Sequence, residues 1–245
     1  MIKISAVSYL NTFPFIYGLN KSKIKNEFEI SRDVPAICAE KLISNQVDIG
    51  LVPVAVLPQL SYYNIITNYC IGAVGKVYTV LLLSHVPLNQ ISEIYLDNES
   101  RTSVQLVKVL AENFWKIKPD WINIKETETK NYQSVVLIGD KTFTEREKYP
   151  YVYDLAEEWS KYTSLPFVFA CWVANKPIPE EFNTLFNESL QQGVENIDEV
   201  IKEFKDQIPV NVNAKEYYTE YISYNLDDNK RKGLNLFLSF LEKMK

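Results

Sequence analysis

The run Val47-Asp48-Ile49-Gly50-Leu51-Val52-Pro53 decides the fold class. It is short, rich in apolar and β-branched side chains and closed by a proline, so it predicts a strand. Before it, residues 28–32 alternate as a strand does, and apolar residues at helical spacing follow Pro35. A strand, a helix and a second strand in succession are typical of α/β architecture.

The same kinds of element extend outward from this unit in both directions. Further strands are predicted at residues 2–7, 65–71, 76–84, 94–96, 121–124, 134–139 and 165–173. Helices are predicted at residues 55–60, 104–114, 182–194, 197–204, 214–221 and 227–245. The order of elements restarts near residue 91, and residues 165–173 predict a strand that returns to the first group.

This restart predicts two lobes in the 245-residue chain. We expect residues 1–85 and 174–245 to form the first lobe and residues 86–173 the second. Two crossing segments would join them, and a cleft would lie between them.

Composition excludes several classes of protein. The chain is 47% hydrophobic and 23% charged, with a net charge of −5 and scattered lysines, which argues against nucleic acid as a partner. No run approaches the roughly 18 apolar residues of a membrane span. The first ten residues show no export signal, so we expect a soluble, cytoplasmic protein. The sequence does not specify an oligomeric state.

The segment Asp97-Asn98-Glu99-Ser100-Arg101-Thr102-Ser103 lies between a predicted strand and a predicted helix. It offers three hydroxyl groups, a guanidinium and the free N–H groups of a helix start, which together suit a carboxylate. The alternative is that Ser100 or Thr102 only caps the helix and Arg101 is a solvated surface group. A cap and an anion site can coexist in one segment.

A second candidate, Ser8-Tyr9-Leu10-Asn11-Thr12, follows the first strand. Open α/β sheets bind ligands at the carboxyl ends of their strands, although an ordinary Asx or Ser/Thr turn is the alternative. Two weaker candidates are Thr79 with Ser84 in an apolar strand, and Gly139-Asp140 at a strand end.

Metal, nucleophile and nucleotide chemistry find little support. His85 is the single histidine and has no cluster of ligands near it in the sequence, so we expect it to be structural or exposed at a hinge. Cys38, Cys70 and Cys171 are widely spaced and predict buried free thiols. The seven glycines form neither a dinucleotide-binding nor a P-loop pattern. We therefore predict no cofactor and no metal.

Four strings together resemble the chorismate dehydratase family in order and spacing. They are Val7-Ser8-Tyr9-Leu10-Asn11-Thr12, Asp33-Val34-Pro35-Ala36, Val47-Asp48-Ile49-Gly50-Leu51-Val52-Pro53-Val54 and Leu96-Asp97 through Ser103. The resemblance is strongest from Ser8 to Ser103 and weaker in the C-terminal helices. It implies a type II periplasmic-binding-protein-like fold with two lobes, an inter-lobe cleft and two crossing segments.

The resemblance also implies an activity. The family consists of carbon–oxygen hydro-lyases that convert chorismate to 3-[(1-carboxyvinyl)oxy]benzoate and water, opening the futalosine route to menaquinone. By the same analogy Asn11 is catalytic, Ser8 and Tyr9 contact substrate from the first lobe, and Ser100, Arg101, Thr102 and Ser103 hold a carboxylate from the second. Gly139 and Asp140 are a looser transfer.

One position departs from the family. A basic residue and a serine usually follow the equivalent of Val77, whereas this chain has Tyr78 and Thr79. The hydroxyl is kept and the charge is not, so Thr79 remains a candidate ligand contact.

No histidine base is evident, so our hypothesis is that a carboxylate of the substrate takes the proton while Asn11 and nearby hydroxyls orient it. Asp140 and Asp154 are the competing bases.

Two other functions share this fold. A non-catalytic binding protein for a small carboxylate would have the same cleft. The sister enzyme, 1,4-dihydroxy-6-naphthoate synthase, typically begins with a Ser-Pro-Cys-Pro-Asn motif and uses a histidine, neither of which matches Ser8 to Thr12 or the position of His85.

Overall fold

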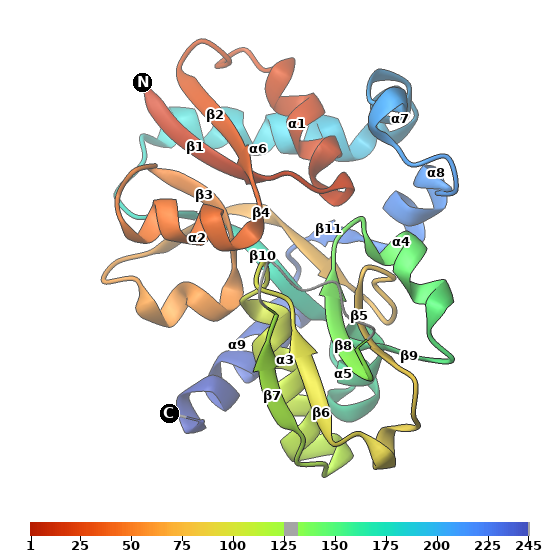
Figure 1. Ribbon diagram of the computed structural model, residues 1–245. Helices are drawn as coiled ribbons and strands as arrows, with labels where there is room; N and C mark the ends of the chain where they lie inside the picture. Colours follow the sequence, from red (N-terminus) through yellow and green to blue (C-terminus); the bar gives the residue numbers. More distant parts are fainter. Residues whose placement is uncertain (125–131, 245) are drawn as a thin grey trace.

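The computed structural model describes residues 1–124 and 132–244. Within them the strands form two separate mixed sheets, each at the centre of one lobe (Figure 1). The strands are β1 (Ile2–Val7), β2 (Phe28–Asp33), β3 (Ile49–Pro53), β4 (Asn64–Ala73), β5 (Val80–Ser84), β6 (Glu93–Leu96), β7 (Asp120–Asn123), β8 (Ser134–Ile138), β9 (Tyr151–Asp154), β10 (Phe167–Ala174) and β11 (Ser223–Asn225). The predicted α/β, two-lobed architecture is confirmed.

The first sheet has the order β11-β4-β10-β3-β1-β2, and the second has the order β7-β6-β8-β5-β9. β1 pairs in parallel with β2 and β3, which brings the carboxyl ends of β1 and β3 to one edge. β6 pairs in parallel with β8, so the segments that follow these two strands also meet. These two groups of strand ends face each other across the lobes.

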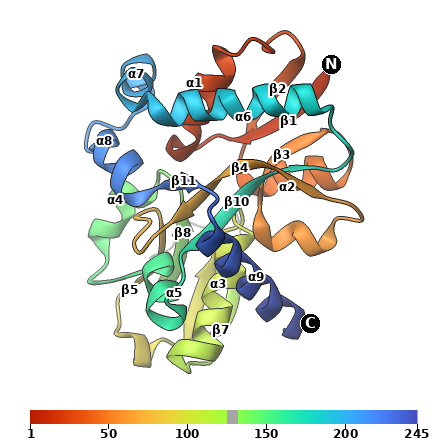
Figure 2. The same cartoon turned by 180° about the vertical axis from the view of Figure 1, so that it is seen from behind.

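Helices cover both sheets. They are α1 (Phe13–Asn20), α2 (Pro35–Ile43), α3 (Thr102–Leu110), α4 (Thr142–Glu145), α5 (Leu155–Thr163), α6 (Glu180–Glu195), α7 (Ile197–Glu203), α8 (Ala214–Glu216) and α9 (Asp228–Lys243). Figure 2 shows α6 along the back of the first lobe and α9 beside β10 and α3. None of the described helices is long and apolar enough to span a membrane.

The lobe boundaries differ from those predicted, which lay between residues 85 and 86 and between residues 173 and 174. β5 pairs with β8 and β9, so it belongs to the second lobe, and β10 pairs with β3 and β4, so it belongs to the first. The chain therefore crosses at residues 74–79 and 164–166. Both strands are buried along their whole length, and a strand that is apolar on both faces gives no sign of which sheet it joins.

The first crossing is shaped by its backbone and held by one carboxylate. Gly75 and Tyr78 have φ angles of 85° and 72°, in the left-handed region that a tyrosine rarely adopts. Asp154 accepts hydrogen bonds from the N–H groups of Val77 and Tyr78, at 3.0 and 2.7 Å, and also caps α5. This anchoring fixes Thr79, the next residue, relative to both lobes.

A close helix contact fixes the segment after β1. A Cβ atom on Gly18 of α1 would lie 1.8 Å from the Ser189 carbonyl oxygen, and one on Gly193 of α6 would lie 1.7 Å from that of Pro14. Only glycine allows the two backbones to approach so closely. This contact fixes the position of α1 against α6. It therefore also fixes the 3₁₀ turn Leu10–Thr12, which leads directly into α1.

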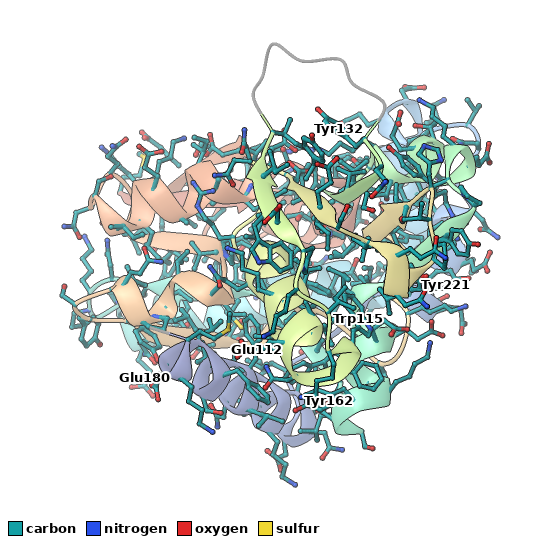
Figure 3. The ribbon with its side chains drawn as sticks, turned by 60° about the horizontal axis from the view of Figure 1, so that its bottom comes forward. Glu112, Trp115, Tyr132, Tyr162, Glu180 and Tyr221 are labelled. Carbon is teal, nitrogen blue, oxygen red and sulfur yellow. The ribbon has the colours of Figure 1, made fainter. Side chains whose placement is uncertain are left out.

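Aromatic side chains pack the outer layer of the second lobe. Tyr162 of α5 contacts the rings of Phe114 and Phe240, which ties α5 to the end of the α3 segment and to α9 (Figure 3). The Trp115 indole N–H donates to Glu158 at 2.8 Å. The three cysteines are free and buried, as predicted.

The local structure differs from the predictions in three places. The strand predicted at residues 76–84 begins only at Val80, because the preceding residues form the first crossing. The helix predicted at residues 55–60 is a 3₁₀ helix, Val54–Gln59, because Pro58 interrupts the α-helical hydrogen bonds. The three-residue strand β11 was not predicted, since it is too short to show alternation.

Candidate functional site

A cavity lies between the lobes and encloses about 520 Å³ of space, its open mouth included. Its lining comes from the ends of β1, β3 and β8, the starts of α2 and α3, and the crossing segments. The lining residues are Val7, Tyr9, Asn11, Pro35, Pro53, Ile71, Val77, Thr79, Val80, Ser100, Thr102, Ser103, Ile138, Gly139, Phe169 and Ala170. No residue in this described lining carries a formal charge, so a ligand meets apolar surface, hydroxyls, an amide and backbone groups.

The second-lobe wall is the start of α3. Ser100 and Ser103 are buried and line the cavity, and the Ser100 hydroxyl accepts a hydrogen bond from the Ser103 N–H at 3.1 Å. Ser100 thus bonds to the backbone at the start of α3 as a capping residue does, and it also lines the cavity where an anion site was predicted. The helix start adds a partial positive charge, which favours an anion in a cavity with an uncharged lining.

Thr102 instead ties the two lobes together. Its hydroxyl donates to the Phe169 carbonyl at 3.0 Å and accepts from the Ala55 N–H at 3.3 Å, and both partners belong to the first lobe. With its hydroxyl engaged in this way, Thr102 positions α3 against β10.

Asn11 and Thr79 belong to the inner wall of the cavity, and Tyr217 lies behind them. We call these three buried residues the floor network. The Thr79 hydroxyl lies 2.8 Å from the Tyr217 hydroxyl. Burial raises the pKa of Tyr217, and hydrogen bonding with Thr79 and the Asn11 side chain opposes that rise. The network is made of neutral groups, and it joins the turn after β1 to the residue before β5.

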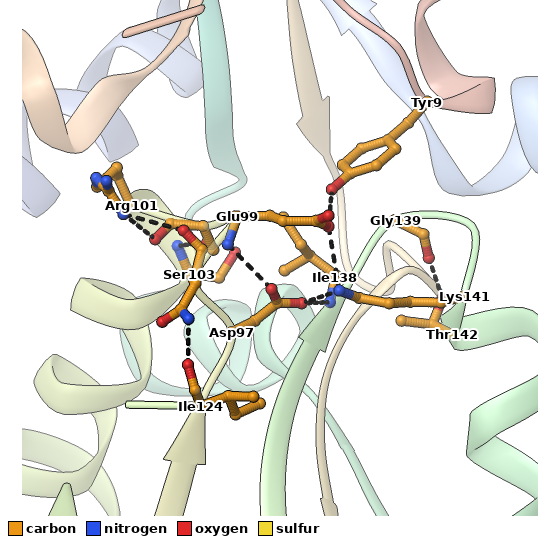
Figure 4. Close-up of polar contacts among 12 residues, drawn as sticks. Tyr9, Asp97, Glu99, Arg101, Ser103, Ile124, Ile138, Gly139, Lys141 and Thr142 are labelled. Carbon is orange, nitrogen blue, oxygen red and sulfur yellow. Dashed lines mark hydrogen bonds and ion pairs between the residues drawn. The ribbon is translucent and has the colours of Figure 1, made fainter. Parts of the chain in front are cut away.

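At the mouth lies a charged group that we call the latch: Tyr9, Asp97, Glu99 and Lys141. The Tyr9 hydroxyl donates across the lobes to Glu99 at 2.6 Å, and Lys141 is 3.1 Å from Glu99 and 2.6 Å from Asp97 (Figure 4). Burial alone would raise the pKa of Glu99, but the Tyr9 hydrogen bond and the Lys141 cation hold that pKa below its ordinary value. The latch keeps Glu99 ionised and the lobes together.

Gly139 and Asp140 make a second contact between the lobes. A Cβ atom on Gly139, whose φ is 70°, would lie 2.8 Å from the Tyr9 ring, so only glycine lets the loop after β8 approach that ring. Both oxygens of Asp140 accept from the Leu10 N–H at 3.1 Å. Burial raises the pKa of Asp140 to about 6, and the Leu10 N–H and Arg32 oppose this rise.

The structure brings most of the predicted site residues to one place. The cavity is lined by Tyr9, Asn11, Thr79, Ser100, Thr102, Ser103 and Gly139. Asp140 adjoins the lining without forming part of it. This gathering depends on the paired strand ends of the two sheets.

Three predicted residues lie elsewhere. Arg101 turns back to the carbonyls of Asn98 and Ser100 rather than toward the cavity (Figure 4). Ser8 is engaged through its backbone, which bonds to Asp33 and Arg32. Ser84 lies at the far end of β5, about 16 Å from Thr79 at strand spacing, and its hydroxyl bonds to Val86 and Ser134.

Asp154, one of the two competing bases, and His85, the single histidine, both lie outside the cavity lining. Asp154 accepts four backbone hydrogen bonds at the first crossing and at the start of α5, and it does not line the cavity. His85 follows β5 and stacks on Tyr149, with 4.5 Å between ring centroids. Among the described residues there is no group of three or more His, Cys, Asp or Glu side chains that could hold a metal ion.

Sequence reasoning missed three functional candidates. Glu99 was part of the quoted loop but had no role, and Lys141 and Tyr217 were not considered. Lys141 directly follows Gly139-Asp140 at the end of a predicted strand. That position could have marked it as a candidate site residue. Tyr217 stands about 140 residues from Thr79, and no pattern in the sequence joins them.

The lobes, the crossings and the cavity define a class: an α/β protein with the architecture of periplasmic binding proteins. The periplasmic aliphatic sulphonate binding protein of Escherichia coli has a TM-score of 0.59 at 13% identity, over 98% of this chain and 92% of that one. A crystal structure of a protein from Archaeoglobus fulgidus has a TM-score of 0.79 at 14% identity, over 99% and 97% of the two chains.

The sequence places the chain within a family. The profile of the VitK2_biosynth family, described as menaquinone biosynthesis, matches residues 2–243, and the chain belongs to that family. It is also 25% identical to the chorismate dehydratase of Thermus thermophilus, a match that covers 87% of each chain. The resemblance in the short motifs therefore extends over nearly the whole length.

Proposed function

We propose that this protein is a chorismate dehydratase, a hydro-lyase that converts chorismate to 3-[(1-carboxyvinyl)oxy]benzoate and water in the cytoplasm, as the first step of the futalosine route to menaquinone. Membership of the menaquinone-biosynthesis family and similarity to the Thermus enzyme support this proposal. The observation that carries it is the cavity: it lies between two lobes and offers hydroxyl and amide donors without a charged side chain in its described lining.

The elimination removes the ring hydroxyl and a ring proton, and it forms an aromatic ring. Because aromatisation supplies the driving force, the enzyme has to fix the conformer and exclude water rather than provide strong acids or bases. In our proposal one substrate carboxylate binds Ser100, Ser103 and the start of α3. The ring then lies against apolar side chains such as Val80 and Phe169, with the departing hydroxyl at the floor network.

The proton acceptor in this proposal is a carboxylate of the substrate. Tyr9 is the one side chain in the described lining that titrates, and burial and the Glu99 hydrogen bond raise its pKa far above neutrality, so it is a poor base. Asp140 is held on the Leu10 N–H, and Asp154 is committed to the crossing. Asn11 would orient the substrate carboxylate and the leaving group.

The direct test is to incubate the purified protein with chorismate, without added metal or nucleotide, and to separate the products by chromatography with mass detection. Loss of one water to give the substituted benzoate, absent from chorismate kept in buffer, supports the proposal. Chorismate that stabilises the protein against heat but is recovered unchanged would favour a binding protein. The sister activity has less support, because His85 lies at the far end of β5 from the cavity.

A further inference from the structure

Tyr217 stands behind the cavity wall and contacts both polar residues of that wall. It belongs to the helical turn Tyr217–Tyr221, which follows α8 in the C-terminal part of the chain. Its side chain is 2% exposed, and its hydroxyl is 2.8 Å from that of Thr79, which itself lines the cavity. Burial raises the pKa of this phenol, and hydrogen bonding with Thr79 and with the Asn11 side chain opposes that rise.

The 2.8 Å contact between Thr79 and Tyr217 allows either hydroxyl to donate. When the Tyr217 hydroxyl donates, the Thr79 oxygen accepts, and Thr79 keeps its own O–H proton for the cavity, since a hydroxyl has one donor and two acceptor positions.

Asn11 is held on its other sides as well. The Thr12 hydroxyl donates to its side-chain oxygen at 3.1 Å, and the Tyr224 hydroxyl donates to its backbone carbonyl at 2.9 Å. The Asn11 amide has two N–H protons, so one remains for a ligand even when the other bonds to Tyr217. In this arrangement the cavity receives one N–H donor from Asn11 and one O–H donor from Thr79.

We propose that Tyr217 is a positioning residue that orients Asn11 and Thr79 so that both present hydrogen-bond donors to an oxygen of the bound substrate. This rests on the proposed function and names the groups that set its geometry. Two fixed neutral donors in a buried wall stabilise negative charge on a departing hydroxyl without reorganisation during the reaction. Tyr217 need not touch the substrate, because it acts through the two residues in front of it.

The test compares Tyr217→Phe with Tyr218→Phe. Each variant loses one buried phenol oxygen from the same helical turn, but the Tyr218 hydroxyl has no hydrogen-bond partner among the residues that the structure describes. We expect kcat for chorismate to fall about tenfold in Tyr217→Phe, the worth of one or two neutral hydrogen bonds, with KM changed by less than about twofold. Tyr218→Phe is expected to keep the wild-type kcat.

A double-mutant cycle separates positioning from general loss of structure. Thr79→Val is expected to lose activity and Thr79→Ser to retain it. The pair Tyr217→Phe and Thr79→Val should cost less than the product of the two single losses, because both changes break the same Thr79–Tyr217 hydrogen bond. Losses that multiply would overturn the proposal, as would equal activity in Tyr217→Phe and Tyr218→Phe.

Two further results distinguish failure of the proposed function from failure of the proposed role of Tyr217. A wild-type protein that leaves chorismate unchanged rejects the proposed function itself, before any variant is considered. If Tyr217→Phe melts well below the wild type, the Thr79 variants carry the test alone. Equal kcat values in Thr79→Ser and Thr79→Val then overturn the positioning role, and a loss confined to Thr79→Val supports it.

Discussion

The floor network and the latch are two ways of joining the same lobes around one cavity. The floor is buried and neutral: Asn11, Thr79 and Tyr217 are 9%, 1% and 2% exposed. The latch is charged and half open to solvent, with the side chains of Glu99 and Lys141 38% and 40% exposed. One region is suited to hold atoms in place during a reaction, and the other to keep the cavity shut.

The physical difference predicts different kinetic effects. A buried neutral network is not screened by salt and has few alternative geometries, so damage to it should appear in kcat. A half-exposed ion pair contributes about 1 kcal/mol or less and is screened, so damage to the latch should appear mainly as a higher KM. The variants below test whether this division holds.

The largest effect is expected from Asn11→Asp. The change keeps the shape of the side chain but replaces two N–H donors with an acceptor that carries charge when ionised. Loss of one preorganised donor to developing negative charge costs about 100-fold or more in kcat, and repulsion of the substrate carboxylate should raise KM as well. Steady-state turnover of chorismate measures both.

Asn11→Ser provides the comparison, because it restores a donor without charge. We expect it to recover part of the activity. Wild-type turnover in Asn11→Asp would show that the floor network does not face the reacting atoms.

A smaller effect is expected from Gly139→Ala, which attacks the contact beside the latch. The added methyl group would meet the Tyr9 ring at 2.8 Å and would also sit at a φ of 70°. Moving the ring breaks its bond to Glu99, so we expect KM to rise by about tenfold and stability to fall by about 1 kcal/mol or more. Kinetics and thermal melting check the two parts.

Gly75→Ala is the matched control. Its φ is 85°, but a Cβ atom there would have nothing within 4 Å among the described residues. It should show the backbone strain without the rise in KM. Equal KM values in the two variants would mean that the approach of Gly139 to Tyr9 does not matter for binding.

Much of the fold could be predicted because it depends on local patterns. The alternation in β1 and β2, Pro35 at the start of α2 and the apolar run of β3 were sufficient for an α/β protein, and the restart of elements near residue 91 indicated two lobes. The lobe boundaries could not be found in this way. β5 and β10 are apolar on both faces, and the sheet that each joins is decided by partners distant in the chain.

The same distinction between local patterns and distant partners applies to the residues of the candidate site. Residues that directly follow strands, such as Tyr9 and Asn11, could be proposed from sequence because strand ends meet at one edge of a sheet. Tyr217 could not, since its contact with Thr79 spans 138 residues. The prediction that Arg101 holds a ligand carboxylate has no support in the structure for a different reason. Its side chain bonds to carbonyls of its own loop, and no residue pattern indicates this.

Tyr9→Phe should have only a modest effect. It removes the hydroxyl that donates to Glu99 at 2.6 Å and keeps the ring against Gly139. We expect KM to rise about three- to fivefold with kcat within about twofold, since one hydrogen bond to a partly solvated carboxylate is lost. Glu99→Gln, which keeps an acceptor for Tyr9, should raise KM less. A large fall in kcat with unchanged KM would instead place the phenol in the chemistry.

Asp140→Asn should change turnover least. It tests whether the Asp140 carboxylate, which belongs to neither the floor network nor the latch, takes the proton from the substrate. Asp140 bonds to Leu10 beside both regions, and an asparagine oxygen can accept the same N–H, so near-normal kcat is expected if the substrate carries its own base. Complete loss of turnover with retained binding would make Asp140 the base.

The pH dependence of stability shows whether Asp140 is buried as described. Its pKa is raised from 3.8 to about 6 on folding, so between these values the folded state binds more protons than the unfolded state. The contribution of Asp140 to the free energy of unfolding therefore falls as pH rises from about 4 to about 6 and is level above that. Asp140→Asn removes this slope, so denaturation at several pH values should find the variant more stable relative to the wild type at pH 7 than at pH 4.5. A difference that does not vary with pH would mean that the carboxylate is solvated, and the contact between Asp140 and Leu10 would then be too loose to hold the lobes together.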